Sequence, residues 1–238
     1  METKDSSPPP AGASSSAASA SGASSAGGGA AAAGRPIILG SSSRSRRAVM
    51  QERLGPRFAG TLSPDIDEKA IGDRSTWRAE DLVLTIARAK CDALAGLSSE
   101  ALGAAGFKGN ELLLCCDQVV RCEGEIREKP IDAAEALRFA RSYSAGAAAE
   151  CVNGLVCLDL ASGKRAERCM VVKVHMGPMS ETQLQEFVAE PALYSCAGGL
   201  RIEDPRMTVL RLEPEGCEDG VMGLPIAVVL ELAQELSQ

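Results

Sequence analysis

The sequence lacks the short patterns that mark several common classes of protein. None of its nine cysteines forms a C-x-x-C pair or clusters with the single histidine, so no zinc site is indicated. No apolar run approaches the roughly 18–20 residues that a membrane-spanning helix needs. The chain has no G-x-x-x-x-G-K-[ST] loop, and no serine is accompanied by a recognisable catalytic histidine motif. These absences disfavour zinc-binding modules, membrane spans, Walker-type nucleotide binders and serine hydrolases.

Charge and cysteine use narrow the remaining classes. The formal net charge is −7, which disfavours general binding to nucleic acid or to an anionic membrane. Several cysteines lie inside apolar runs, and buried free thiols are typical of a reducing compartment. We therefore expect a cytoplasmic protein that binds neither nucleic acid nor membranes. The basic cluster of Arg44, Arg46 and Arg47 then needs a local explanation.

The first 34 residues consist mostly of Ala, Ser, Gly and Pro. Such a segment buries too little apolar surface to offset chain entropy, so we expect residues 1–34 to be a disordered extension. Residues 35–238 are expected to form one domain. The extension is rich in Ser and Ala, as transit peptides are, but it has no arginine before Arg35. A plastid or mitochondrial location is the alternative to the cytoplasm.

Apolar periodicity predicts strands and helices that alternate along the rest of the chain. Strands are expected over 36–39, 112–116, 151–160, 168–175 and 208–212. Helices are expected over 45–54, 76–94, 132–143, from 180 to just before 191, and from 225 onward. Turns or loops are expected over 62–68 and 96–110. The mixture, without an internal repeat, predicts an α/β fold.

The helix expected over 76–94 carries an apolar face. Leu82, Val83, Ile86, Ala89 and Ala93 keep the spacing of one helical face. This spacing predicts an amphipathic helix.

The stretch after the first strand is a candidate phosphate site. A loop between a strand and a helix exposes backbone N–H groups at the positive end of the helix dipole. Arg46 and Arg47 in the first helical turn would add charge-assisted hydrogen bonds to phosphate oxygens. The same run of arginines is more often a solvated surface or a nuclear-localisation signal. The pattern alone leaves these interpretations open.

Other charged residues occupy positions that suggest chemistry. Asp117 follows five apolar residues directly, and a charge there is costly unless it is paired or binds a cation. The acidic turn of Asp65, Asp67 and Glu68 could supply oxygen ligands to a divalent cation. Lys129, which precedes a proline, could face a phosphate. Each position is also compatible with an ordinary turn or surface residue.

These pieces occur together, and in order, in one family. From about residue 36 to 236, the chain resembles the Maf-like nucleotide pyrophosphatases. The matching motifs are S-x-S-P-x-R-R at Ser41, Ser43, Arg46 and Arg47; D-E at Asp67 and Glu68; A-x-x-K from Ala87 to Lys90; D-Q at Asp117 and Gln118; G-x-I-x-x-K-P from Gly124 to Pro130; A-G at Ala197 and Gly198, followed by Glu203; and G-L-P from Gly223 to Pro225.

The chain also departs from the family pattern. Arg44 stands where the family has proline, Ser45 replaces a larger residue, and residues 144–154 lack the family's His and Thr. Its longer loop, Gln118 and Glu203 resemble the 7-methyl-GTP sub-type more than the dTTP/UTP sub-type.

The resemblance implies a fold and an activity. The fold is a single Maf/ITPase-like domain with a central mixed β-sheet flanked by helices and a nucleotide-binding cleft. The activity is hydrolysis of a nucleoside triphosphate, 7-methyl-GTP-like, to the monophosphate and pyrophosphate, which removes non-standard nucleotides. The alternatives are a dTTP/UTP pyrophosphatase and a non-catalytic nucleotide-binding regulator of septum formation. Because members of the family are often dimers, a homodimer is compatible with the resemblance.

The resemblance also implies roles for single residues. Asp117 would accept a proton from the attacking water, with Glu68 and Lys129 as further catalytic residues. The ligands of a divalent cation, Mg²⁺ or Mn²⁺, would be Asp117, Glu68 and Glu203. The residues expected to bind phosphate are Ser41, Ser43, Arg46, Arg47 and Lys129. The residues expected to set substrate choice are Ser45, Gln118 and Glu203.

Overall fold

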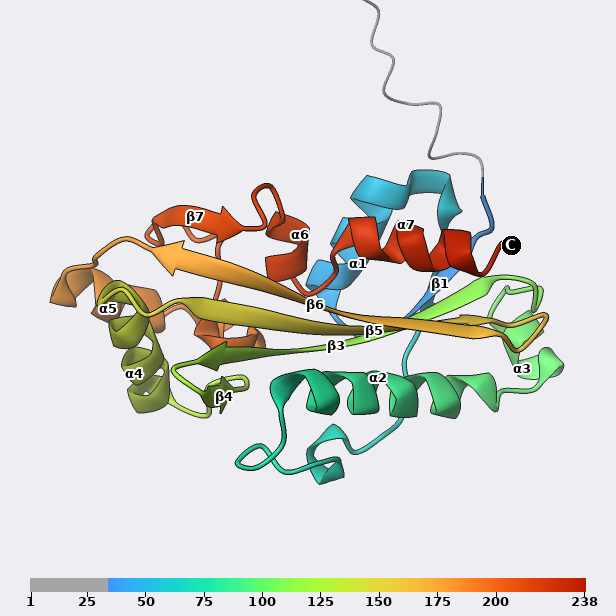
Figure 1. Cartoon of the computed structure of the whole chain (residues 1–238), viewed down its shortest axis with the longest axis horizontal. Coiled ribbons are helices and arrows are strands. Elements are labelled where there is room, and N and C mark those ends of the chain that lie inside the picture. The colour runs from blue at the N-terminus through green and yellow to red at the C-terminus, as the bar shows by residue number, and fades with distance from the viewer. Residues whose placement is uncertain (1–33) are drawn as a thin grey trace, which may run out of the picture.

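A computed structural model describes residues 34–238 (Figure 1). Disorder was expected for residues 1–34. Of these, residues 1–33 lie outside the described residues. The strands are β1 (Ile37–Gly40), β2 (Phe58–Leu62), β3 (Leu112–Cys122), β4 (Glu125–Arg127), β5 (Ala149–Asp159), β6 (Arg165–Met176) and β7 (Val209–Glu213). The helices are α1 (Arg44–Leu54), α2 (Ala79–Ala95), α3 (Ser99–Ala104), α4 (Ala133–Ser144), α5 (Glu181–Val188), α6 (Glu218–Val221) and α7 (Ile226–Glu235).

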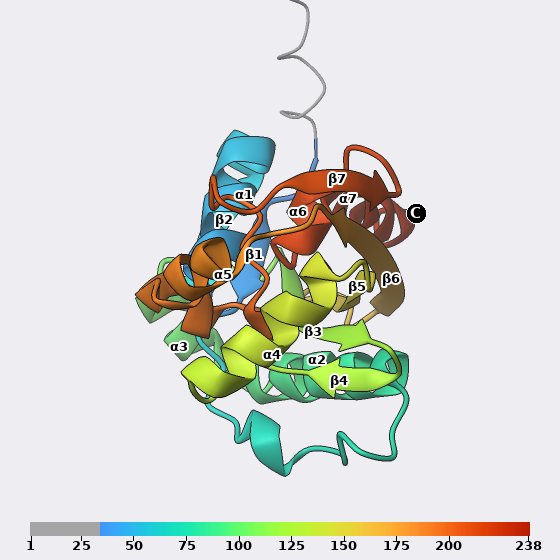
Figure 2. The same cartoon turned by 90° about the vertical axis from the view of Figure 1, so that its left-hand side faces the viewer.

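One mixed sheet runs through the described part of the chain. Its strand order is β2-β1-β3-β5-β6-β7, and β4 pairs with β3 outside this path. β1 is parallel to both β2 and β3, whereas β3, β5, β6 and β7 pair antiparallel. Helix α2 covers one face of the sheet, and α1 and α7 cover the other (Figures 1 and 2). The predicted α/β class and central mixed sheet are confirmed.

Close packing of α2 on the sheet depends on a glycine. Residue 154 lies in β5, and a Cβ atom added to Gly154 would stand 2.6 Å from the carbonyl carbon of Val83 in α2. Only a residue without a side chain lets the backbones of helix and strand approach this closely. The approach brings the buried face of α2 against β3 and β5.

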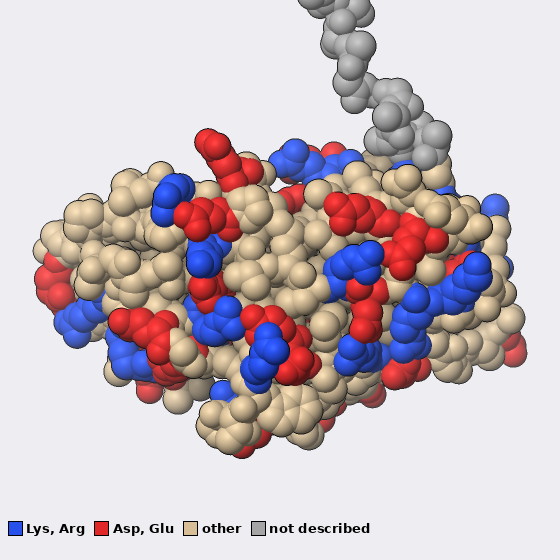
Figure 3. All heavy atoms as spheres, viewed as in Figure 1, with Lys and Arg blue, Asp and Glu red and all other residues tan. Residues whose placement is uncertain are grey.

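Ion pairs also join the two helical layers to β6. Arg88 of α2 pairs with Glu167 at 2.5 Å, and Arg168 pairs with Glu235 of α7 at 2.8 Å. On the surface seen in Figure 3, basic and acidic side chains are interspersed, and no large area carries charge of one sign. Because exposed pairs contribute about 0–1 kcal/mol each, the apolar layers between the elements provide most of the stability.

Several boundaries and elements differ from the prediction. The strand β2 and the short helices α3 and α6 were not predicted, because each has too few residues to show a clear apolar period. Helix α2 begins three residues later than expected. The Asp73 carboxylate accepts the N–H of Ser75 at 2.8 Å and closes a turn there. The predicted strand at 112–116 continues through Asp117 to Cys122, so Asp117 lies within β3 and not after its end.

Within residues 34–238, no helix combines the length and the apolar character that crossing a membrane requires.

Candidate active site

A cleft of about 960 Å³ opens beside β3. Seven segments line it: the loop after β1 with the start of α1, the loop before α2, Ile86 and Lys90 of α2, the middle of β3, the segment after β4, residues 192–203, and Val221 with Met222. Ligand pockets in proteins commonly have volumes of about 300–1,000 Å³, so the cleft has room for a nucleotide.

The cleft exists because two neighbouring strands differ in length. β1 ends at Gly40, which pairs with Cys115, whereas β3 continues for seven more residues to Cys122. Asp117 and Gln118 therefore lie beyond the end of β1 and both line the cleft. Since β1 and β3 are parallel, this is the carboxyl edge of their pairing, where ligands bind in α/β sheets.

The serine loop after β1 is held by its own hydroxyl groups. Ser41 Oγ accepts the N–H of Ser43 at 3.2 Å, and Ser43 caps α1 by accepting the N–H of Arg46 at 3.4 Å. The hydroxyl of Ser45 lies 3.0 Å from that of Ser43. The loop thus presents the start of an eleven-residue helix to the cleft, as the sequence predicted.

The neighbouring arginines of this loop point to different places. Arg46 lines the cleft, where Nη1 donates to the carbonyl of Cys116 at 2.9 Å and Nε donates to that of Gly223 at 3.0 Å. Arg44 also lines the cleft and is exposed. Arg47 is exposed, donates to Thr61 Oγ1 at 3.3 Å and is absent from the cleft lining of the described residues. Phosphate binding by Arg47 stays a prediction that this arrangement does not support.

Three side chains from separate elements meet at the floor of the cleft. Lys90 of α2 donates to Asp117 Oδ1 at 2.8 Å and pairs with Glu68 Oε2 at 3.0 Å. The side chains of Lys90 and Asp117 are 5% and 9% exposed, whereas that of Glu68 is 48% exposed. Among the described residues, only Lys90 donates a hydrogen bond to the Asp117 carboxylate. The second oxygen of Asp117 is therefore able to accept a proton or hold a ligand.

Lys90 was matched to a motif in the sequence but was given no role. The buried stripe of α2 consists of Ala79, Leu82, Val83, Ile86, Ala87, Lys90, Cys91 and Leu94. The predicted apolar face was wrong at Ala89 and Ala93, because neither is buried. A predicted buried face that included Ala87 would also have included Lys90, which lies three residues later in the helix. A buried lysine needs a carboxylate partner, and that signal could have identified the floor.

Gln118 lies on the side of β3 opposite to Asp117. Its amide nitrogen donates to the carbonyls of Gly220 and Val221 at 3.1 and 3.0 Å. Asn153 of β5 donates to the same Gly220 carbonyl at 3.0 Å, although its own Oδ1 is buried and has no hydrogen-bond partner among residues 34–238. The two amides fix the α6 segment as a wall of the cleft. Gln118 Oε1 stays near the backbone of Gly223, where an added Cβ would lie 3.1 Å away.

The remaining predicted residues also line the cleft. Lys129 follows β4 and is exposed, and Glu203 is exposed in the segment after the short helical turns at 191–199. Ser45 lines the cleft from the start of α1. Of the residues predicted for the site, all except Arg47 and Asp65 therefore line the cleft.

Cys196 also lines the cleft, although the sequence did not single it out. Burial raises the pKa of its thiol, and the nearby Glu203 carboxylate raises that pKa further. A thiol with a raised pKa is protonated at neutral pH and is a poor nucleophile. The side chains of the site therefore favour acid–base chemistry by carboxylates over nucleophilic attack by a thiolate.

The predicted metal ligands form a partial set. Among the described residues, no three His, Cys, Asp or Glu side chains cluster in a way that could hold a metal ion, so Glu203 does not join Glu68 and Asp117 in such a group. Magnesium is commonly held by one or two carboxylates together with substrate phosphates. The Glu68 and Asp117 carboxylates fit that donor chemistry, with Lys90 between them. The choice of Mg²⁺ or Mn²⁺ stays a prediction.

Comparison with known proteins shows what the chain is similar to. A family model described as Maf-like protein matches residues 36–236. A 7-methyl-GTP pyrophosphatase of Dictyostelium discoideum is 33% identical over 203 residues, which cover 85% of this chain and 98% of that protein. A 7-methyl-GTP pyrophosphatase of Pseudomonas aeruginosa is 29% identical, over 84% of this chain and 95% of its own length. A nucleoside triphosphate pyrophosphatase of Trichormus variabilis is 28% identical, over 84% of this chain and 93% of its own length.

Proposed function

Because this chain belongs to the Maf-like protein family, we propose that it hydrolyses nucleoside triphosphates to the monophosphate and pyrophosphate. Such an enzyme removes non-standard nucleotides from the cell. One observation carries the proposal: a buried aspartate with one open oxygen lies in a nucleotide-sized cleft, next to a capped helix start and basic side chains.

In the proposed mechanism, the basic residues hold the polyphosphate. The N–H groups of the serine loop, Arg46 and Lys129 neutralise charge on the phosphate oxygens. Two hydrogen bonds to backbone carbonyls already orient Arg46, so little ordering is needed when phosphate binds. Lys129 is exposed, and the flexible stem of a lysine side chain allows its ammonium group to move into contact with a bound phosphate.

The chemical step is assigned to Asp117. Its open oxygen accepts the proton of a water whose oxygen forms a bond to the α-phosphorus. The bond between that phosphorus and the bridging oxygen breaks, and pyrophosphate leaves. Lys90 keeps Asp117 in place by its hydrogen bond at 2.8 Å. A divalent cation bound by Glu68 and Asp117 would neutralise phosphate charge.

We further propose a preference for 7-methyl-GTP-like substrates. Two of the relatives described above are named 7-methyl-GTP pyrophosphatases. The exposed Glu203 carboxylate in the cleft lining would favour a purine that carries positive charge.

A nucleotide panel tests the proposal. The purified full chain is mixed with Mg²⁺ or Mn²⁺ and with 7-methyl-GTP, GTP, UTP or dTTP, and pyrophosphate and phosphate are measured separately. We expect pyrophosphate release, fastest with 7-methyl-GTP, and its loss when the cation is removed by a chelator. Faster release from UTP and dTTP would identify the other sub-type. Tight binding of nucleotides without release of pyrophosphate would refute the enzymatic function.

A further inference from the structure

The segment between β2 and α2 carries Glu68 to the floor of the cleft. We call residues 63–78 the acidic loop. Besides Arg74, three of its side chains contact other parts of the fold: Glu68 pairs with Lys90 at 3.0 Å, Arg78 pairs with Glu80 at 3.8 Å, and Ile71 packs against an apolar cluster that includes Leu82 and Ile86 of α2. Its own backbone hydrogen bonds form a short helical turn at Glu68–Ala70 and a turn at Asp73, but they do not connect these two turns.

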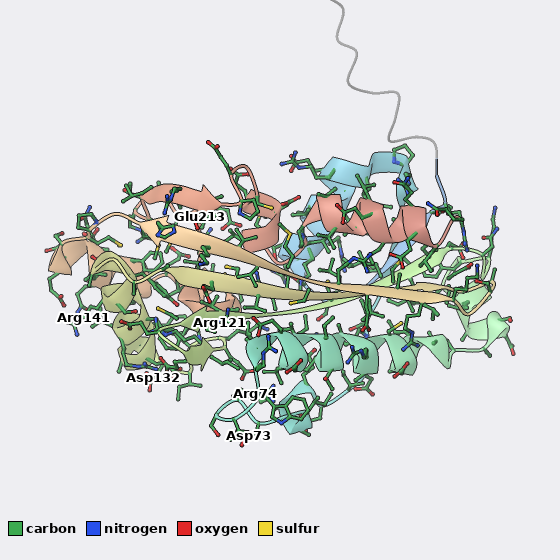
Figure 4. All side chains as sticks on the ribbon, viewed as in Figure 1. Asp73, Arg74, Arg121, Asp132, Arg141 and Glu213 are labelled. Atoms are coloured by element: carbon green, nitrogen blue, oxygen red, sulfur yellow. The ribbon has the colours of Figure 1, made fainter. Side chains whose placement is uncertain are left out.

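The guanidinium of Arg74 adds a restraint that connects residue 74 to the backbone of residues 68–72. Figure 4 shows Arg74 in the acidic loop beneath α2. The side chain is 22% exposed. Its donors reach the carbonyl oxygens of Glu68 at 3.0 Å, Lys69 at 3.4 Å, Gly72 at 3.2 Å, and Ile71. One side chain therefore binds four backbone carbonyls within residues 68–72, of which the Glu68 carbonyl also accepts the N–H of Ile71 at 3.4 Å.

The same guanidinium also reaches another segment of the cleft lining. Its Nε donates to Glu128 Oε1 at 3.0 Å, and its Nη2 lies 2.9 Å from that oxygen. Glu128 directly precedes Lys129, and the Glu128 carbonyl accepts the N–H of Gly198 at 2.8 Å. Arg74 thus connects the segment that carries Glu68 with the segment that carries Lys129.

We propose that Arg74 is a positioning residue for the reaction, which holds Glu68 and Lys129 in register through the Glu68 carbonyl and the Glu128 carboxylate. The catalytic consequence rests on the proposed function, whereas the restraint on the acidic loop does not. Arg74 is absent from the cleft lining of the described residues, so it acts through its neighbours and touches no substrate. Its planar fork of five donors makes lysine a poor substitute.

The test compares Arg74→Ala with a matched control, Arg88→Ala. Arg88 makes a similar two-nitrogen contact with Glu167, at 2.8 and 2.5 Å, and lies outside the cleft lining. Both changes remove one inter-element ion pair, and Arg74→Ala also removes hydrogen bonds to four carbonyls, so the melting temperature should fall slightly in Arg88→Ala and further in Arg74→Ala. We expect Arg74→Ala to lower kcat by up to about 100-fold, since a misplacement of about 1 Å costs that much. Arg88→Ala should leave kcat unchanged.

Three further measurements separate positioning from a purely structural role. In Arg74→Ala, the cation concentration for half-maximal activity should rise, because Glu68 is a proposed cation ligand; in Arg88→Ala it should not. Arg74→Lys should restore only part of kcat. Glu128→Gln, which keeps an oxygen acceptor, should retain more activity than Glu128→Ala. A wild-type kcat and unchanged cation dependence in Arg74→Ala would overturn the proposal.

Hydrogen exchange distinguishes failure of this inference from failure of the proposed function. If the wild type releases pyrophosphate from no nucleotide, the proposed function fails and the catalytic role of Arg74 fails with it. The restraint is still decided by amide exchange over residues 68–72. Faster exchange there in Arg74→Ala, but not in Arg88→Ala, would support it. Equal exchange in both variants would overturn it.

Discussion

Two buried aspartates in the same sheet differ in what surrounds them. Asp117 in β3 and Asp159 at the end of β5 are 7% and 5% exposed. Asp159 accepts hydrogen bonds from Arg35 at 2.5 Å, from the N–H of Ala161 at 3.0 Å and from the hydroxyl of Ser162 at 2.5 Å. Asp117 accepts one, from Lys90. Asp159 is saturated by its neighbours, whereas Asp117 keeps an oxygen open toward the cleft.

This difference separates a structural carboxylate from a functional one. A buried carboxylate without full compensation is costly, and folds retain one where a ligand or a reaction uses it. The hydrogen bond from Arg35 lowers the pKa of Asp159, with smaller contributions from Ser162 and Ala161. Burial alone therefore does not identify the site, whereas the number of acceptor positions left unfilled on the carboxylate does.

The largest expected effect is on turnover in Asp117→Asn. The amide keeps the size of the side chain but cannot accept the proton of the attacking water, so we expect a loss of about 10²–10⁴-fold in kcat. Pyrophosphate release measures the loss, and thermal unfolding checks that the fold persists. Asp159→Asn is the control and should keep its turnover. Similar losses in both variants would remove the distinction between the two aspartates.

The next effect concerns Lys90→Met. Removing the ammonium leaves Asp117 and Glu68 next to each other without their cation, and breaking such a buried pair costs about 3–5 kcal/mol. Because Glu68 is half exposed, we expect a loss near the lower end of that range in urea unfolding. Added Mn²⁺ should raise the unfolding midpoint of this variant more than that of the wild type. A stability equal to that of the wild type would mean that Lys90 does not compensate Asp117.

The smallest effect is the pH dependence of Asp159→Asn. The pKa of Asp159 is lowered in the fold, so its stabilising contribution is present above the unfolded pKa of about 3.9 and is lost as pH falls below it. At pH 7 the variant should be less stable than the wild type by about 1–3 kcal/mol. The gap should close below about pH 4. A gap that persists in acid would show that the Asp159 charge does not contribute.

Local features of the fold were predictable because their causes lie within a few residues. Ser43 at the start of α1, Asp132 at the start of α4 and Ser180 at the start of α5 all accept a backbone N–H of the first turn. The long strands β5 and β6 and the turn between them were also predicted, since their apolar residues are dense and Gly163 has a φ of 74°. Short elements such as β2 and α3 have too few residues to show the apolar periodicity from which a strand or helix is predicted.

The candidate site was predictable as a set of residues but not as an arrangement. Matching motifs placed Glu68, Asp117 and Lys129 in one site, and all three line the cleft. The role of Lys90 was missed, because the partners of a buried lysine are 22 and 27 residues away in sequence. Arg74 was missed for a similar reason, since Glu128 is 54 residues away. Such pairings depend on the packing of α2 and its loop on the sheet.

The sequence by itself determined the class of fold, the order of the motifs and the capped loop that faces the cleft, because these follow from neighbours along the chain. Tertiary structure decided which charges meet. It placed Arg46 against the carbonyls of Cys116 and Gly223 and turned Arg47 toward Thr61. It also left Asp117 open where β1 ends and β3 continues. The unequal lengths of two paired strands, which no local pattern encodes, open the cleft at that carboxylate.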